Sequence, residues 1–142
     1  MRAVQLDSFG GPELLAVREV PAPQAGPGQI RVRVTAAGLN PMDWIITADA
    51  DTAARFGLSL PVGFGTDYAG VIDQFGDGVS GFAVDDRVFG GALSRAVADF
   101  VLINVTGGSR PRRRITFPTV STTAPPQPWR SPVVPRRRPW PW

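Results

Sequence analysis

"FGTDYAGVIDQFGDGVSGFAVDDRVFG", residues 64–90, is the stretch that decides the fold of this chain. It contains a short apolar run at 68–72, which is typical of a buried strand rather than of a helix. Residues 75–82 follow with three glycines in eight positions, a pattern that predicts a tight connection with a positive φ angle. A second strand is expected at 86–90, so this stretch predicts two strands joined by a Gly-rich turn.

Further strands are predicted on both sides of this stretch. Residues 29–36, "QIRVRVTA", alternate apolar and polar side chains, which indicates a strand with one solvated face. Residues 13–20 are also expected to form a strand. Residues 96–103 are predicted to be a strand that is apolar, and therefore buried, on both faces. Many short strands with Gly-rich turns favour a β-barrel or a sandwich.

One helix is expected at about 41–49. Asn40 is a good N-cap residue, Pro41 suits the first helical position, and Asp43 places a negative charge in the first turn. These capping roles are by themselves one sufficient explanation of Asn40 and Asp43.

Charge divides the chain at about residue 104. Residues 1–104 hold 7 arginines and all 12 acidic residues, whereas residues 105–142 hold 8 arginines and no acid, so the two parts carry 7 − 12 = −5 and +8. The second part also holds 9 of the 15 prolines and 3 of the 4 tryptophans. We expect it to be a disordered or polyproline-like tail, which attracts polyanions without recognising a specific nucleic acid.

The absence of Cys and His excludes several classes of chemistry. Zinc sites depend mainly on these two residue types, so no metal site is expected. Nucleophilic catalysis that uses His as a base is excluded for the same reason. Hydride transfer from a bound cofactor needs little from side chains and remains open. With neither a secretory signal at the start nor a membrane-spanning apolar run, the predicted location is the cytoplasm.

Three segments together resemble a known family. They are "GxNPxDW" at 38–44, "GxDxAGVI…GxGVxGFxxxDRVFG" at 65–90, and "GALSRAVADFVLIN" at 91–104. In this order they resemble the N-terminal, GroES-like domain of the zinc-free quinone oxidoreductase branch of the medium-chain dehydrogenase/reductase superfamily. The resemblance covers residues 1–104. It implies a mainly β fold, a partly open GroES-like β-barrel with one or two short helices.

The resemblance also implies a function. Zinc-dependent members carry a Cys ligand where this chain has Asn40, and a His–Glu pair where it has Thr66 and Asp67. This chain is therefore expected to contribute to the NADPH-dependent reduction of quinones or conjugated carbonyl compounds. The implied substrate and cofactor cleft is lined by Asn40, Asp43, Thr66 and Asp67, with Trp44 as a wall beside them, and no residue is assigned as catalytic.

More ordinary explanations of the same residues remain open. Trp44 and Tyr68 could belong to the core. Thr66 and Asp67 could simply end a loop before a strand. Asp85 stands where the family usually has Gly, and we expect the turn to survive because Asp tolerates the left-handed conformation.

The Gly-rich strand–turn–helix of a Rossmann domain does not occur in this sequence. We therefore expect a truncated catalytic domain that is inactive alone and does not bind NADPH tightly. The hypothesis for residues from about 105 onward is an out-of-frame reading of the gene. A non-enzymatic binding module with a basic, proline-rich tail is the alternative function, and self-association through uncovered strands is expected.

Overall fold

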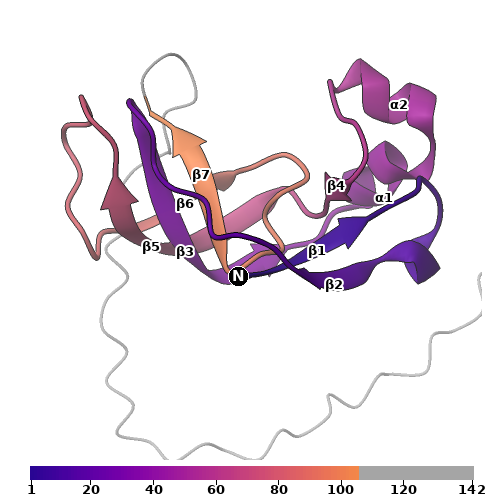
Figure 1. Ribbon diagram of the computed structural model, residues 1–142, viewed down its shortest axis with the longest axis horizontal. Coiled ribbons are helices and arrows are strands. Elements are labelled where there is room, and N and C mark those ends of the chain that lie inside the picture. Colours follow the sequence, from indigo (N-terminus) through magenta and orange to yellow (C-terminus); the bar gives the residue numbers. More distant parts are fainter. Residues whose placement is uncertain (106–142) are drawn as a thin grey trace, which may run out of the picture.

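The structure is a computed structural model that describes residues 1–105 (Figure 1). The predictions for the tail, beyond Val105, lie outside the described residues, and the division of the chain at residue 104 stays a prediction. In chain order the elements are β1 (Arg2–Leu6), η1 (Pro12–Leu14), β2 (Ala16–Glu19), β3 (Gln29–Gly38), α1 (Pro41–Ala48), α2 (Ala50–Arg55), β4 (Val62–Gly63), β5 (Asp67–Phe75), β6 (Arg87–Gly91) and β7 (Phe100–Asn104).

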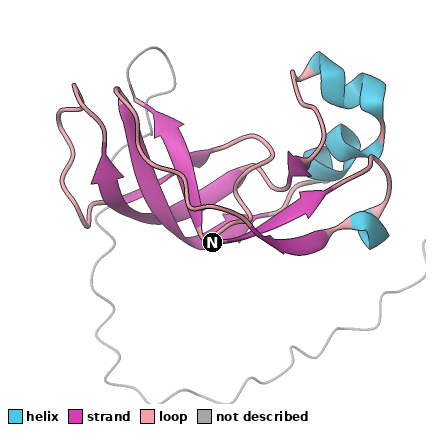
Figure 2. Cartoon of the chain, viewed as in Figure 1, coloured by secondary structure: helices cyan, strands magenta, loops and turns pink. Residues whose placement is uncertain are grey.

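The strands form two antiparallel sheets, in the orders β2-β1-β4 and β6-β5-β3-β7. The helical segments gather at one side of the molecule (Figure 2). In the part of the chain that the structure describes, no helix is long and apolar enough to cross a membrane. The prediction of a mainly β fold with one or two short helices is confirmed.

The segment that precedes β7 connects the two sheets. The amide of Val4 donates to the carbonyl of Val97 and the amide of Asp99 to the carbonyl of Arg2, both at 2.9 Å, and Ala3 forms an isolated bridge with Ala98. The amide of Val34 on β3 donates to the carbonyl of Asp99, also at 2.9 Å, so residues 97–99 join β1 to the larger sheet without continuous strand pairing. The arrangement is that of a partly open barrel.

Strand β3 organises the larger sheet. It pairs with β5 over its whole length, from Ile30 opposite Phe75 to Gly38 opposite Asp67, with shifts of register along the way. With β7 it pairs only over residues 29–33. The second half of β3 therefore has a strand neighbour on one side only, and residues 35–39 are exposed.

The main core lies against one face of the larger sheet. Ile30, Val32 and Ile72 are fully buried there, as the alternation of residues 29–36 predicts for the first half of that stretch. Tyr68 is also a core residue, with 3% of its surface exposed. A smaller core cluster around Leu6 supports the sheet of β1, β2 and β4.

Three sequence predictions need correction. Residues 13–20 do not form one strand, because a 3-10 turn ends at Leu14 and β2 begins only at Ala16. Residues 96–103 are strand only from Phe100, because residues 96–99 are engaged in linking the two sheets. The prediction that this strand is buried on both faces is also wrong. One of its faces is buried and the other, which includes Phe100, is half-buried.

The turn between β5 and β6 behaves as expected. Asp85 has a φ angle of 68°, in the left-handed region. Gly78 and Gly81 in the Gly-rich stretch also have positive φ angles. Asp85 thus adopts the left-handed conformation, as expected for a residue type that tolerates it.

Candidate active site

The candidate site begins where β3 leads into α1. Asn40 has an extended backbone (φ −124°, ψ 155°) and Pro41 starts the helix. The Asp43 carboxylate reaches back and accepts the backbone N–H of Asn40 through Oδ2 at 2.7 Å. This is one half of a capping box, and it fixes the loop against the first helical turn.

Asp43 also connects the helix to the loop before β5. It is almost completely buried, with 2% of its surface exposed. Its Oδ1 atom accepts the hydroxyl of Thr66 at 2.7 Å, and the Thr47 hydroxyl donates to its backbone carbonyl at 3.0 Å. The Thr66 carbonyl accepts the amide of Ala92 at 2.7 Å. Thr66 is thus held by its side chain on one side and by its backbone on the other.

Asn40 and Asp67 meet across the sheet. The Asn40 amide nitrogen Nδ2 donates to Asp67 Oδ2 at 2.9 Å, although 27 residues separate them in the sequence. Gly38 makes this approach possible, because a Cβ at that position would lie 3.1 Å from the Cβ of Asp67. The pairing of Gly38 with Asp67 at the end of the β3–β5 ladder places the two polar side chains side by side.

Trp44 is expected from the sequence to be either a wall of the cleft or a core residue, and its side chain is partly buried and partly exposed. Its ring lies 4.6 Å from the ring of Phe64, at an interplanar angle of 55°, and Phe64 is a buried member of the smaller core cluster. Nevertheless 38% of Trp44 remains exposed. One face of the indole therefore packs on the core, while the rest is available to the surface.

The structure thus brings together the predicted site residues in one small region. Asn40, Asp43, Thr66 and Asp67 form a continuous chain of hydrogen bonds, and Trp44 follows Asp43 on the same helix. Within residues 1–105 the ion pairs involve other carboxylates, so neither Asp43 nor Asp67 has a cationic partner there. No group of three or more metal-ligating side chains occurs in the same residues.

Asp67 also lines a groove of about 710 Å³ that sequence reasoning missed. On β5, Asp67, Ala69 and Val71 alternate with buried residues, so they lie on the face of the sheet that is turned away from the core. The period-2 pattern of "DYAGVI" could have indicated this second face. The groove is lined by Thr35, Ala36, Ala37, Gly38, Asp67, Tyr68, Ala69, Gly70, Val71, Arg87, Val88 and Phe89.

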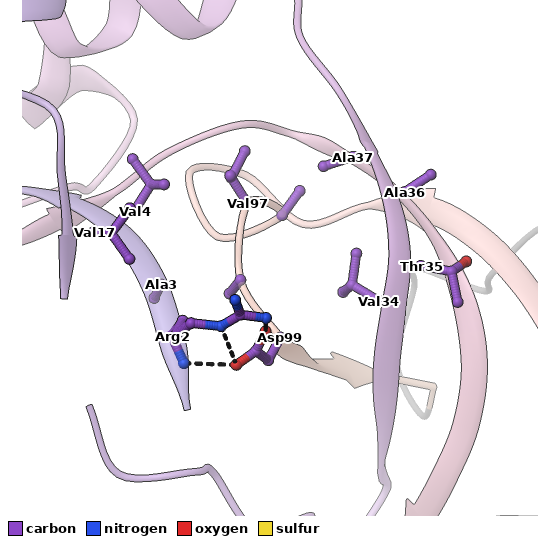
Figure 3. Close-up of a pocket in the computed structure, with 12 residues that line it drawn as sticks. Arg2, Ala3, Val4, Val17, Val34, Thr35, Ala36, Ala37, Val97 and Asp99 are labelled. Carbon is purple, nitrogen blue, oxygen red and sulfur yellow. Dashed lines mark hydrogen bonds and ion pairs between the residues drawn. The ribbon is translucent and has the colours of Figure 1, made fainter. Parts of the chain in front are cut away.

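A smaller pocket of about 300 Å³ lies on the other side of the same half of β3. Figure 3 shows Val97 and Asp99 between the β1 residues and Val34, with Arg2 joined to Asp99 near them. The Arg2 guanidinium and amide both donate to the Asp99 carboxylate, at 3.0 Å and 2.7 Å. This pocket is the gap that the incomplete barrel leaves between β1 and β3.

A family model described as "Alcohol dehydrogenase GroES-like domain" matches residues 26–108. Among curated proteins, the quinone oxidoreductase of Rattus norvegicus is 40% identical over 106 residues, which cover 72% of this chain and 31% of that protein. The human quinone oxidoreductase is 39% identical over 104 residues, again 72% of this chain and 31% of the relative. The chain spans about a third of the length of the curated relatives it matches.

Solved structures that resemble this chain also include quinone oxidoreductases. The quinone oxidoreductase of Coxiella burnetii superposes with a TM-score of 0.67 at 30% identity, covering 73% of this chain and 34% of that one. The Escherichia coli quinone oxidoreductase complexed with NADPH gives a TM-score of 0.66 at 27% identity, with 74% and 31% coverage.

Proposed function

Because the chain belongs to the alcohol dehydrogenase GroES-like domain family, we propose that it forms the N-terminal, substrate-facing part of an NADPH-dependent oxidoreductase. The proposed substrates are quinones or conjugated carbonyl compounds. The observation that carries the proposal is the hydrogen-bonded chain of Asn40, Asp43, Thr66 and Asp67, whose last member also lines a large apolar groove. Relatives that are quinone oxidoreductases by name support the choice of substrate.

The side chains of the site suit such substrates better than they suit a metal. A quinone or an enone takes up hydride into a delocalised system, so it depends less on a Lewis acid than a simple ketone does. The site offers a carboxamide, a hydroxyl and carboxylates, and the whole sequence lacks the Cys and His ligands that zinc prefers. Zinc does not fit this donor set, and we propose that hydrogen bonds orient the substrate instead.

The described residues do not fit the pyrophosphate of NADPH. A pyrophosphate is usually held by free backbone N–H groups at a helix N-terminus. At the start of α1 the carboxylate of Asp43 already occupies that position, and at the start of α2 the Asp49 side chain accepts the amide of Thr52. Both helices thus place a negative charge where the phosphates would sit. The cofactor, which supplies the hydride when bound, is therefore proposed to be held by protein outside these residues.

The test is a chimera in which residues 1–105 replace the aligned segment of the rat quinone oxidoreductase. We expect the chimera to oxidise NADPH in the presence of 1,4-naphthoquinone, because the cofactor-holding part comes from the relative. The chimera with Asn40→Ala should lose at least tenfold in kcat/KM, whereas Asp77→Ala, in a remote exposed turn, serves as the matched control. A folded chimera that binds NADPH but reduces no quinone would refute the proposal.

The unmodified chain should oxidise NADPH with a quinone only at the background rate. An ordinary enzymatic rate from the purified chain would contradict the assignment of the cofactor site to other protein. The alternative of a binding module depends on the tail, which lies outside the described residues, and it stays a prediction, as does the cytoplasmic location.

A further inference from the structure

The direction of one hydrogen bond determines what the site can offer to a ligand. The hydroxyl of Thr66 donates to Asp43 at 2.7 Å, and a carboxylate can only accept. The single proton of that hydroxyl is therefore committed to Asp43. Thr66 can still accept a hydrogen bond from a ligand, but it cannot donate one.

The carboxylate of Asp43 is held in the orientation in which it accepts the hydroxyl of Thr66. Its second oxygen accepts the backbone amide of Asn40, also at 2.7 Å, and the side chain is buried. Rotation of the carboxylate would break both hydrogen bonds and leave a buried charge without its partners, which is unfavourable. The polarity of Thr66 is thus set by a fixed neighbour rather than by the ligand.

Asn40 is the remaining neutral donor of the network. Its amide group has two N–H bonds, and one of them is used by Asp67 at 2.9 Å. For the second N–H the structure records no acceptor within residues 1–105. Asp67 itself is exposed, and within residues 1–105 its carboxylate takes part in no ion pair.

We propose that Asp43 is a positioning residue that fixes the hydrogen-bond polarity of the site. It holds Thr66 as an acceptor, so that the amide of Asn40 is the donor for the carbonyl oxygen of a bound substrate. The exposed charge of Asp67 makes the site selective for neutral carbonyl compounds over carboxylates of the same size. This inference rests on the proposed function, and it names the donor and the substrate class.

Replacing Asp43 by Asn should reverse the polarity of Thr66. The carboxamide oxygen is needed by the backbone amide of Asn40, so the NH2 group of the new side chain faces Thr66 and donates to it. The hydroxyl proton of Thr66 is then free to point toward a ligand. The Asp43→Asn variant therefore gains a second donor in the site while the capping geometry of α1 is retained.

The experiment is a double-mutant cycle on the full chain, followed by proton–nitrogen NMR titration with 1,4-naphthoquinone. We expect Thr66→Val to weaken quinone binding roughly three- to tenfold more in the Asp43→Asn background than in the native one, as for the loss of one neutral hydrogen bond. A purely structural role of Asp43 would give the same effect in both backgrounds. Equal effects, or a larger effect in the native chain, would overturn the inference.

Two further measurements keep the test decisive if Asp43→Asn does not fold. In the native background Thr66→Val should weaken quinone binding less than about threefold, and a loss of tenfold or more would show that the hydroxyl donates to the ligand. In addition, 1-naphthoate should bind at least about tenfold more weakly than the quinone, and Asp67→Asn should narrow that ratio. A naphthoate that binds as tightly as the quinone would refute the selectivity.

The outcomes separate the two proposals. If the quinone does not bind, or binds without shifting the amide signals of Asn40, Thr66 and Asp67, both the proposed function and this inference fail. If the quinone binds at these residues but the cycle detects no coupling between Asp43 and Thr66, only the inference fails.

Discussion

Removing the carboxylate of Asp43 should destabilise the whole domain, because this one side chain links α1 to the loop before β5. In Asp43→Ala the Thr66 hydroxyl and the Asn40 amide both lose an acceptor that lies at 2.7 Å. Hydrogen bonds to a charged group contribute about 1.5–3 kcal/mol each. Thr66 is half-buried and can turn partly toward water, so we take the lower end and expect a total loss of about 3 kcal/mol in the free energy of unfolding.

The assay is urea unfolding at neutral pH, followed by far-ultraviolet circular dichroism at low protein concentration. Asp51→Ala is the matched control, because Asp51 also stands in the first turn of a helix but is exposed. Its effect should stay within about 0.5 kcal/mol. If Asp43→Ala cost less than about 1 kcal/mol, or no more than the control, the carboxylate would not hold the site together and the reasoning above would be wrong.

Three other predictions follow from the same structure. Gly70→Ala should lower the melting temperature sharply, because a Cβ there would collide with a backbone carbonyl of β3, whereas Gly91→Ala, which meets only an ordinary contact at 3.8 Å, should have little effect. The side-chain hydrogen bond from Arg2, together with the backbone hydrogen bond and the charge of Arg2, holds the pKa of Asp99 below its usual range. The ionised carboxylate of Asp99 therefore stabilises the fold at neutral pH, and this stabilisation is lost as the pH falls below about 4. In Asp99→Asn the free energy of unfolding should therefore fall less steeply as the pH is lowered than it does in the native chain. An unchanged dependence on pH would contradict this prediction. Burial raises the pKa of Tyr68 to about 12, so its stabilising neutral form is lost as the pH rises above about 10, and phenolate absorbance should appear together with alkaline unfolding rather than before it.

Local sequence patterns were sufficient for the elements whose periodicity is strong. The alternation in residues 29–36 predicted the buried positions Ile30 and Val32, and the Asn40–Pro41 pair predicted the start of α1. The boundary of β7 could not be predicted in this way. Residues 96–99 are as apolar as a strand, and only their contacts with β1 show that they serve as a link between sheets.

The site was predicted residue by residue through family resemblance, but its connections were not. Asn40 meets Asp67 because of the register of β3 on β5, and Asp43 meets Thr66 because α1 packs beside the following loop. These contacts join residues 27 and 23 positions apart, so no local pattern could have revealed which polar atom faces which. The register of β3 on β5 depends on how the two strands pair in the folded sheet, so it cannot be read from either segment alone.

The two halves of β3, a strand of ten residues, should differ in the rate at which their amide protons exchange with solvent. Its first half lies between two strands, so the amide protons of Ile30 and Val32 should exchange with solvent only when the entire domain opens. Its second half has a strand neighbour on one side only, and the amides from Ala36 to Gly38 should exchange through brief local fluctuations. The end of β3 leads into Asn40, so we expect the candidate site to be attached to the part of the strand that opens most readily. Asp43, which is buried and hydrogen-bonded to Asn40, should open more slowly.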